Sequence, residues 1–389
     1  MPLDLSKPLQ PQLLAGDGPV CLVITARLVP VGETDRFQPA GFPEIGHVIY
    51  DAPRIDADGR KYKEKVCIID SPASMANHLE KVCLEGEAVM NLHPDLEGLP
   101  FVCCVTDSEF KTIDGVIQPK PESKKNAEVV STFSEGHRLA SDYFLDAKRL
   151  VKEEPAQKSL REELRESFKI IEVKKDKTYF IPPGTWWNIY KTIFQFDPNS
   201  LVHGVMFAKE QIKISRLLTA HLEAFGAARV GRSGVKFDRL QKTTSGQPIF
   251  SVDEETAEEI RATFILDLAL LRSYGRGENG LGDTQKRLLL DLALWKIAQL
   301  VKRPFRYRTQ CFLQCQSVQL ATEAGDVGSG AAESLFDSLK ITESIKECKF
   351  STTRTDVYYP ANELFKPGKD TDATTNNEGD DEDNDQESA

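Results

Sequence analysis

The sequence predicts an α+β fold whose centre is a ferredoxin-like or RRM-like sheet interrupted by long insertions. Three observations predict it. The chain has 389 residues, of which 40% are hydrophobic, so it can bury a large core. Segments with strand-like and helix-like patterns follow one another as strand, helix, hairpin, helices and strand. This order matches a β-α-β-β-α-β core.

The first elements are marked by strong local signals. A strand is predicted over 20–30, which is rich in β-branched residues and bounded by glycine and proline. A loop rich in glycine and proline follows over 32–46. A short strand over 66–70 then leads into a helix, with Ser71 as its N-cap and Pro72 at its first position.

The next segments alternate between apolar and charged composition. A strand is predicted over 101–106. The polar range 111–138, which contains Pro119 and Pro121, is interpreted as an insertion or mobile loop. A charged helix is predicted over 157–167, because Glu, Arg and Lys recur there at helical spacing.

Two β-type runs in the middle of the chain predict a hairpin. They cover 186–196 and 201–208 and are rich in aromatic and β-branched residues. The four residues 197–200, Asp-Pro-Asn-Ser, lie between them and are typical of a turn.

Helices are predicted for most of the remaining core. Apolar residues recur at helical spacing over 214–225, 256–274 and 286–301. Pro304 ends this stretch. The range 305–313 alternates strictly between two sets of side chains and predicts a strand.

Charge divides the chain into a nearly neutral body and an acidic end. The formal net charge is −11, but nine acids lie from Asp370 onward, and the rest carries 51 acids against 49 bases. We expect an N-terminal extension over 1–19, an RRM-like domain with insertions over 20–320, a C-terminal extension over 321–368 and a disordered acidic tail over 369–389.

Composition argues for a cytoplasmic protein without disulfides, metals or cofactors. No apolar run approaches the roughly 20 residues that cross a bilayer, so no membrane partner is expected. The first eleven residues lack the pattern of a signal peptide. Most of the eight cysteines lie in apolar runs, and the chain has no C-x-x-C pair, which favours buried, reduced thiols.

Common catalytic motifs are missing from the sequence. It contains no phosphate-binding loop, zinc-protease motif or nucleophile elbow. The pattern G-x-G-x-x-G occurs once, at 275–280, but it joins two predicted helices, and a dinucleotide site needs it after a strand. A helix–helix loop is therefore favoured, whose flanking Arg272 and Arg276 could contact phosphates.

Two basic segments are candidates for contact with a nucleic-acid backbone. In the range 226–236, Arg229, Arg232 and Lys236 alternate with glycines, so that cations and backbone amides can approach phosphates together. In the last predicted strand, Arg306 and Arg308 share a face with Gln310 and Phe312, which suits phosphate pairing and base stacking. Each segment could equally be an ordinary solvent-exposed loop or strand.

The predicted helix after residue 70 is a third candidate. Ser71, Ser74 and His78 lie along one stripe, with Asn77 beside them, and the stripe begins at a helix N-terminus, which attracts phosphate. Side chains so close on one stripe cannot form a Ser–His–Asp relay. The alternative is a capped, partly buried helix.

Several sequence blocks follow one another in a recognisable order. They are RFQPAGFP at 36–43, DSPASMANHLE at 70–80, EGHR at 135–138, SLVHGV at 200–205, GVK at 234–236, LALLRSYG at 268–275, LAL at 292–294 and RYRT at 306–309. This order, from about residue 20 to about residue 315, resembles a known family, the backbone subunits of the type I-G (formerly I-U) CRISPR Cascade complex in the RAMP superfamily.

The resemblance implies a hand-shaped RRM-like palm with large inserted finger and thumb elements. It also implies that several copies polymerise along a guide (CRISPR) RNA, together with other Cascade subunits, and present it for pairing with target DNA. Such subunits do not cut; a recruited helicase-nuclease does. His78 departs from the pattern, where an arginine is expected, which puts a charge contact from this helix in doubt.

We therefore predict a non-catalytic, RNA-binding role in antiviral defence, within a ribonucleoprotein. The alternatives are an RNA-processing ribonuclease of the same superfamily and a protein-only scaffold. The predicted guide-RNA contacts are Arg36, Gln38, Ser71, Ser74, Asn77, His203, Arg229, Arg232, Lys236, Arg272, Arg276, Arg306 and Arg308.

Overall fold

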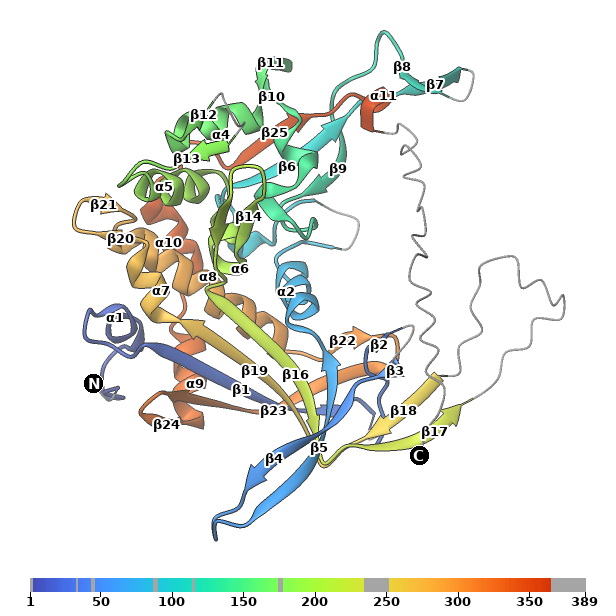
Figure 1. Ribbon diagram of the computed structural model, residues 1–389, viewed down its shortest axis with the longest axis vertical. Coiled ribbons are helices and arrows are strands. Elements are labelled where there is room, and N and C mark those ends of the chain that lie inside the picture. Colours follow the sequence, from blue (N-terminus) through green and yellow to red (C-terminus); the bar gives the residue numbers. More distant parts are fainter. Residues whose placement is uncertain are drawn as a thin grey trace, which may run out of the picture.

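The computed structural model describes residues 3–32, 34–42, 46–86, 90–113, 116–173, 178–233 and 252–364 (Figure 1). Helices and strands both contribute to the core, which confirms the predicted α+β class. None of the helices in these ranges is long and apolar enough to cross a membrane.

The described residues form an eight-stranded antiparallel sheet that crosses the lower part of the molecule in Figure 1. Its strands, in spatial order, are β22 (Phe305–Arg308), β23 (Cys311–Thr322), β1 (Cys21–Pro30), β19 (Glu259–Asp267), β16 (Leu218–Phe225), β5 (Lys61–Asp70) and β4 (Ile49–Ile55), with β24 (Gly325–Gly328) paired to β23.

The four central strands of this sheet follow a specific chain order. Strands β1, β16, β19 and β23 occur in this order in the sequence but lie in space as β23, β1, β19, β16, with antiparallel neighbours. The helices α2 (Pro72–Lys81) and α6 (Pro198–His203) precede β16, and α7 (Leu268–Ser273) and α8 (Asp283–Val301) follow β19. The chain order is thus strand, helix, strand, strand, helix, strand.

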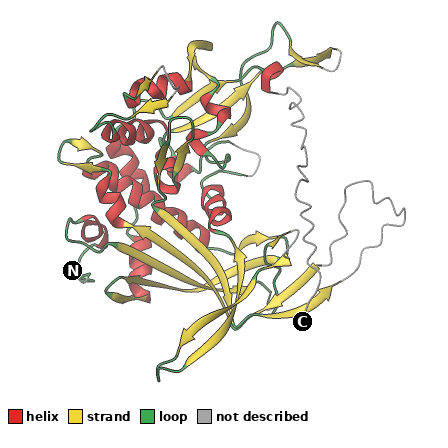
Figure 2. Ribbon diagram, in the orientation of Figure 1, coloured by secondary structure: helices red, strands yellow, loops and turns green. Residues whose placement is uncertain are grey.

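Helices cover one face of this sheet. Alternate residues such as Leu22 and Ile24 of β1 and Ala262 and Phe264 of β19 are fully buried, and their neighbours are partly exposed. Helices α2, α7 and α9 (Ser329–Asp337) contact strands of the sheet, and they lie on its upper side in Figure 2. Burial of one set of alternate residues is what a half-covered sheet requires.

A five-stranded sheet forms the upper part of the molecule (Figure 1). Its order is β11 (Glu154–Ser159), β10 (Lys148–Val151), β25 (Arg354–Tyr358), β6 (Phe101–Thr106) and β9 (Ala127–Ser131). Strands β25 and β6 are parallel, with Arg354 opposite Phe101. The range 321–368 therefore contributes a strand to a sheet built mainly from residues 101–159.

The other described elements are short helices and two-stranded hairpins. The helices are α1 (Leu9–Leu14), α3 (Asp142–Leu145), α4 (Leu160–Phe168), α5 (Trp186–Phe196), α10 (Ile341–Cys348), α11 (Ala361–Leu364) and the 3-10 turns η1 (Pro94–Leu96) and η2 (Arg138–Ala140). The hairpins are β2 (Gly41–Phe42) with β3 (Gly46–His47), β7 (Phe110–Ile113) with β8 (Val116–Pro119), β12 (Ile171–Val173) with β13 (Thr178–Phe180), β14 (Val205–Phe207) with β15 (Ile212–Ile214), β17 (Ala228–Ser233) with β18 (Val252–Thr256), and β20 (Gly275–Arg276) with β21 (Asn279–Gly280).

Several predicted elements are confirmed. Strands β1, β5 and β6 contain or closely match the predicted ranges, and α8 matches 286–301 with three further residues at its start. Helix α4 begins three residues after the predicted charged helix and ends one residue after it, and it starts with a capping box between Ser159 and Glu162.

The predicted hairpin over 186–208 is wrong. Residues 186–196 form α5, with Ile189 and Ile193 one helical turn apart and fully buried. Pro198 does not sit in a turn but begins α6, where its fixed φ and missing N–H are tolerated. Only Val205–Phe207 is a strand. The aromatic and β-branched composition indicated strands, but burial at helical spacing decided the fold.

The predicted helix over 214–225 is also wrong, as is the first half of that over 256–274. Strands β16 and β19 occupy these ranges, and α7 follows β19. The prediction rested on apolar residues four positions apart, such as Ile260 and Phe264. A spacing of four fits a helix and also alternate positions of a strand, and here Ala262 and Leu266 complete the strand pattern.

Two further ranges differ from the prediction. Residues 305–313 are not one strand but parts of β22 and β23, with Arg306 opposite Phe312 and Gln310 in the turn. The range 111–138 is not irregular throughout, since it contains most of β7, then β8 and β9. The acidic tail over 369–389 lies outside the described residues.

Candidate nucleic-acid interface

The N-terminus of α2 is organised by the buried carboxylate of Asp70. Asp70 ends β5, and its Oδ1 accepts a hydrogen bond from the Ser71 N–H at 3.0 Å. Its Oδ2 accepts one from the Ser74 hydroxyl at 3.0 Å. The Ser71 side chain accepts from the Ser74 N–H at 3.2 Å and caps the helix, as predicted.

Two cationic or titratable side chains also contact Asp70. Arg308 of β22 pairs with Asp70 through Nη2, which lies 3.3 Å from the Ser74 hydroxyl. His78 Nε2 lies 2.8 Å from Asp70 Oδ2. Burial alone would raise the pKa of Asp70, but the hydrogen bond from His78 and the charge of Arg308 hold its pKa below the usual value. Asp70 therefore fixes α2 and β22 to each other as a carboxylate.

The loop before β2 connects three elements around this site. The Phe37 and Glu255 backbones exchange two hydrogen bonds of 2.9 Å, which attach the loop to β18. The Gln38 N–H donates to the Gln310 carbonyl at 3.0 Å, in the turn between β22 and β23. The Ala40 N–H donates to the Ile69 carbonyl at 2.9 Å. Arg36 and Gln38 are thereby held beside β18, β22 and β5.

A second buried carboxylate, Glu255, holds the start of the β17–β18 hairpin. Its Oε1 accepts from Arg229 Nε at 3.2 Å and lies 3.1 Å from His47 Nδ1. Arg36 Nη1 lies 3.7 Å from the neighbouring Glu254. Burial and the nearby charge of Glu255 raise the pKa of the Cys67 thiol to about 12, so this thiol is protonated at neutral pH.

The structure thus brings six predicted residues together from four separate segments of the chain. We call this set the junction surface: Arg36, Gln38, Ser71, Ser74, Arg229 and Arg308. Two more predicted residues lie next to it. Arg306 is exposed on β22, with its guanidinium 5.8 Å from the centre of the Phe312 ring. Asn77 is exposed on α2 and lines a pocket of about 360 Å³.

Comparison with protein families identifies this architecture. The family model described as CRISPR-associated protein GSU0053 (Cas_GSU0053) matches residues 22–229, which is more than half of the chain. The chain belongs to this family. The predicted resemblance to a CRISPR Cascade protein is confirmed.

Two solved structures match the chain with low TM-scores. One is a chain of a "CRISPR RNA-guided surveillance complex, pre-nicking", with 10% identity and a TM-score of 0.35, covering 77% of this chain and 75% of that one. Another is Csc2 from Thermofilum pendens, with 12% identity and a TM-score of 0.27, covering 87% and 81%. No curated protein sequence matches this chain.

His203 does not reach the junction surface, because it is 1% exposed at the end of α6. Burial, together with the charges of Lys296 and Arg138, lowers its pKa well below the usual value, so the ring is neutral. A neutral, enclosed imidazole cannot pair with a phosphate, and His203 is excluded from the proposed RNA contacts.

Arg272 and Arg276 lie on another part of the molecule. Arg272 donates two hydrogen bonds of 3.0 Å to the carbonyls of Leu13 and Pro19 and so anchors the segment that contains α1. Arg276 is exposed on the β20–β21 hairpin between α7 and α8. In Figure 1 this hairpin and β22 lie on opposite sides of α8. The glycine pattern 275–280 joins two helices, as predicted, with a short hairpin inside it.

Two predicted contacts are not placed by the structure. Lys236 lies outside the described residues. Arg232 belongs to β17, with its backbone opposite Asp253, but its side chain is outside the described part. Both remain predictions from sequence.

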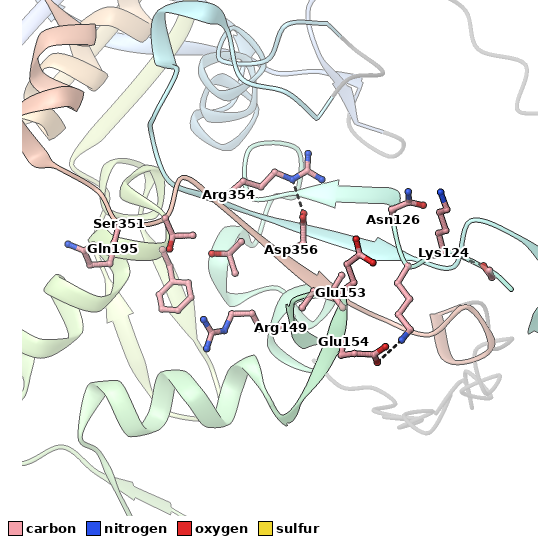
Figure 3. Close-up of a pocket in the computed structure, with 15 residues that line it drawn as sticks. Lys124, Asn126, Arg149, Glu153, Glu154, Gln195, Ser351, Arg354 and Asp356 are labelled. Atoms are coloured by element: carbon pink, nitrogen blue, oxygen red, sulfur yellow. Dashed lines mark hydrogen bonds and ion pairs between the residues drawn. The ribbon is translucent and has the colours of Figure 1, made fainter. Parts of the chain in front are cut away.

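A pocket of about 800 Å³ lies on the five-stranded sheet and contains none of the predicted residues (Figure 3). Three of its four cations, Lys125, Arg149 and Arg354, are already paired with acids. Arg354 Nε lies 2.7 Å from Asp356, and Lys125 Nζ lies 3.1 Å from Glu154. This mixed charge gives the pocket little attraction for a polyanion.

A row of lysines on β5 escaped the sequence analysis. Lys61, Lys63 and Lys65 are all exposed and occupy alternate positions of the strand. The run K-Y-K-E-K at 61–65 could have revealed them, because period-two alternation puts such lysines on one face.

Proposed function

We propose that this protein binds guide RNA as a backbone subunit of a type I CRISPR effector complex. The observation that carries the proposal is the junction surface, where hydrogen bonds connect the distant segments that carry six residues chosen from sequence. Family membership supports the same role independently.

The chemistry of the junction surface suits an RNA backbone. A guanidinium has five N–H donors, so an arginine that already binds a carboxylate can also bind a phosphate. Arg308 pairs with Asp70, yet its side chain is 37% exposed. The N-terminus of α2 adds the positive end of a helix dipole next to it. We infer that the surface grips phosphates and leaves base pairing to the RNA itself.

The fold suggests how the RNA is carried. We propose that the strands β23, β1, β19 and β16 with α2 and α8 are the RRM-like palm. The five-stranded sheet and the β17–β18 hairpin would then be the finger and thumb insertions. Several copies would polymerise along the RNA and present it, with other subunits, to target DNA.

The arrangement around α2 supports a non-catalytic role. Ser74 and His78 both contact Asp70, and Asp70 lies between them, so His78 does not receive a proton from Ser74. If the purified chain cleaved precursor RNA and the substitution His78→Ala abolished that cleavage, the protein would instead be a ribonuclease.

The proposal is tested by co-expressing the chain with a CRISPR array and its neighbouring subunits. We expect a large, nuclease-protected particle enriched in repeat–spacer RNA. The double variant Arg36→Glu/Arg306→Glu should lose most of this RNA, because Arg36 is exposed at the junction surface and Arg306 is exposed next to it.

The control is Lys191→Glu/Lys209→Glu, which makes the same charge change at exposed sites elsewhere. It should retain the RNA. A chain that stays free of nucleic acid with all partners present would contradict the proposed function, and equal RNA loss in both variants would contradict the junction surface. Assembly that survives complete nuclease digestion would favour a protein-only scaffold.

A further inference from the structure

The β4–β5 ribbon projects away from the body of the molecule, at the bottom of Figure 1. The pairing of β5 with β16 ends at Val66, so the only strand that pairs with residues 61–65 is β4. The two faces of this ribbon differ in chemistry.

One face packs against the sheet. Arg54 of β4 pairs with Glu64 at 2.7 Å and lies over the ring of Phe225 at 5.6 Å. Ala52, Val66 and Phe225 form a small buried cluster on this side. The contacts fix the orientation of the ribbon and leave its other face outward.

The outward face carries the lysine row, Lys61, Lys63 and Lys65. These residues lie opposite Ile55, Pro53 and Asp51 of β4. Lys65 is 3.5 Å from Asp51 but has a side chain that is 64% exposed. Lys61 and Lys63 have no acidic partner among the described residues. The outward face therefore has an excess of positive charge.

The lysine row is continuous with the junction surface. The Ala227 N–H donates to the Lys65 carbonyl at 3.1 Å, which places the start of β17 beside the row. Arg229, two residues later, belongs to the junction surface. Lys65 is also linked to the junction surface along the strand itself, since β5 leads from Lys65 to Asp70 and on to Ser71.

We propose that the lysine row binds the phosphate backbone of the same single-stranded RNA that the junction surface holds, and extends its path onto the β4–β5 ribbon. Alternate residues of a strand are about 7 Å apart, which is comparable to the distance between phosphates of an extended strand. A lysine ammonium is a mobile point charge and accommodates any base sequence. The inference rests on the proposed function.

A different role for such lysines is to keep an exposed strand edge from pairing with other strands. That role predicts no change in RNA affinity when the lysines are removed, and so the two are separable by measurement.

The test uses the full-length chain and a labelled 24-nucleotide oligouridylate, with affinity measured by fluorescence anisotropy across a salt series. The variant is Lys61→Ala/Lys63→Ala/Lys65→Ala. Its dissociation constant should rise on the order of tenfold at low salt, and the slope of log K against log salt should fall by about 2, at about 0.7 per lost contact with a single strand.

The matched control is Lys191→Ala/Lys209→Ala/Lys213→Ala, three exposed lysines on α5 and around β14–β15. It has the same net charge as the test variant and should bind like the wild type. Equal loss in both variants would show a general charge effect and overturn the inference. Unchanged RNA affinity in the test variant would also overturn the inference, even if the size of the assembled particle changed. Failure of the wild type to bind would instead overturn the proposed function.

Discussion

At the residue scale, the arginines of the junction surface each have an acidic neighbour inside the protein. Arg308 contacts Asp70 and Arg229 contacts Glu255, and both carboxylates are buried. These acids hold the guanidinium groups in place before any ligand arrives, so less side-chain entropy is lost when a phosphate binds. Because of this local neutralisation, the proposed contacts to RNA depend on geometry more than on net charge.

Glu80 occupies the centre of a buried polar network below the junction surface. It accepts hydrogen bonds from Arg138 at 2.6 and 2.9 Å and from Asn199 Nδ2 at 2.7 Å. Lys296 bonds to the other side of Asn199. The network connects α2, η2, α6 and α8, and each member depends on the others for its partners.

We expect Glu80→Ala to lower the free energy of unfolding by about 3–5 kcal/mol, because Arg138 would remain buried without its partner. Urea denaturation measures this. The control Glu154→Ala removes the partner of Lys125 in an exposed pair and should cost less than about 1 kcal/mol. Similar costs for both would mean that the network contributes no more than a surface pair.

At the element scale, hairpins extend the central sheet outward. Strands β16 and β19 continue into β17 and β18 after a break in the pairing, so one long ribbon carries residues from the sheet to beyond the junction surface. Arg232 of β17 lies on this ribbon, three residues after Arg229 of the junction surface.

The substitutions Arg232→Glu and Lys236→Glu should therefore weaken RNA retention and flatten its salt dependence, because two phosphate contacts would be lost. Filter binding at several salt concentrations measures both effects. Stability should be unchanged. RNA retention equal to that of the wild type would remove this ribbon from the proposed binding surface.

Prediction from sequence succeeded where local signals act alone. Ser71 and Pro72 fix the start of α2 by capping and by a preset φ, and both are visible in the sequence. It failed for α5 and β16, where the choice between helix and strand depends on which neighbour buries the side chains. The lysine row was missed because its meaning depends on which face of β5 is covered.

The candidate site shows the same contrast between local sequence signals and packing between distant elements. Arg308 and Ser74 were selected separately, and nothing local indicates that both contact Asp70. His203 was selected from a motif, but its burial follows from the packing of α6 against α8. Residue spacing does not reveal long-range packing, so a residue predicted from sequence to contact RNA can be buried in the folded protein.

At the scale of the whole molecule, the charge is strongly uneven. The junction surface and the lysine row present cations, whereas nine acids lie from Asp370 onward. We expect truncation after Phe365 to increase binding of unrelated RNA, since the acids compete with it for the cations. Anisotropy with the oligouridylate at low salt measures this.

A second variant separates charge from length. It keeps all residues but changes the nine acids to Asn or Gln, and it should behave like the truncation. If neither change alters RNA binding, the acidic end acts only on solubility.

The parallel pairing of β25 with β6 joins residues about 250 positions apart in the centre of one sheet. On the ribosome, β6 and β9 emerge long before β25 exists, by roughly 10–50 s at ordinary rates of synthesis. Until β25 is made, the edges of β6 and β10 that will pair with it have no partner strand. Such unpaired edges can bind other chains. We expect the folding of this five-stranded sheet to depend most on chaperones and to be least tolerant of premature stop codons.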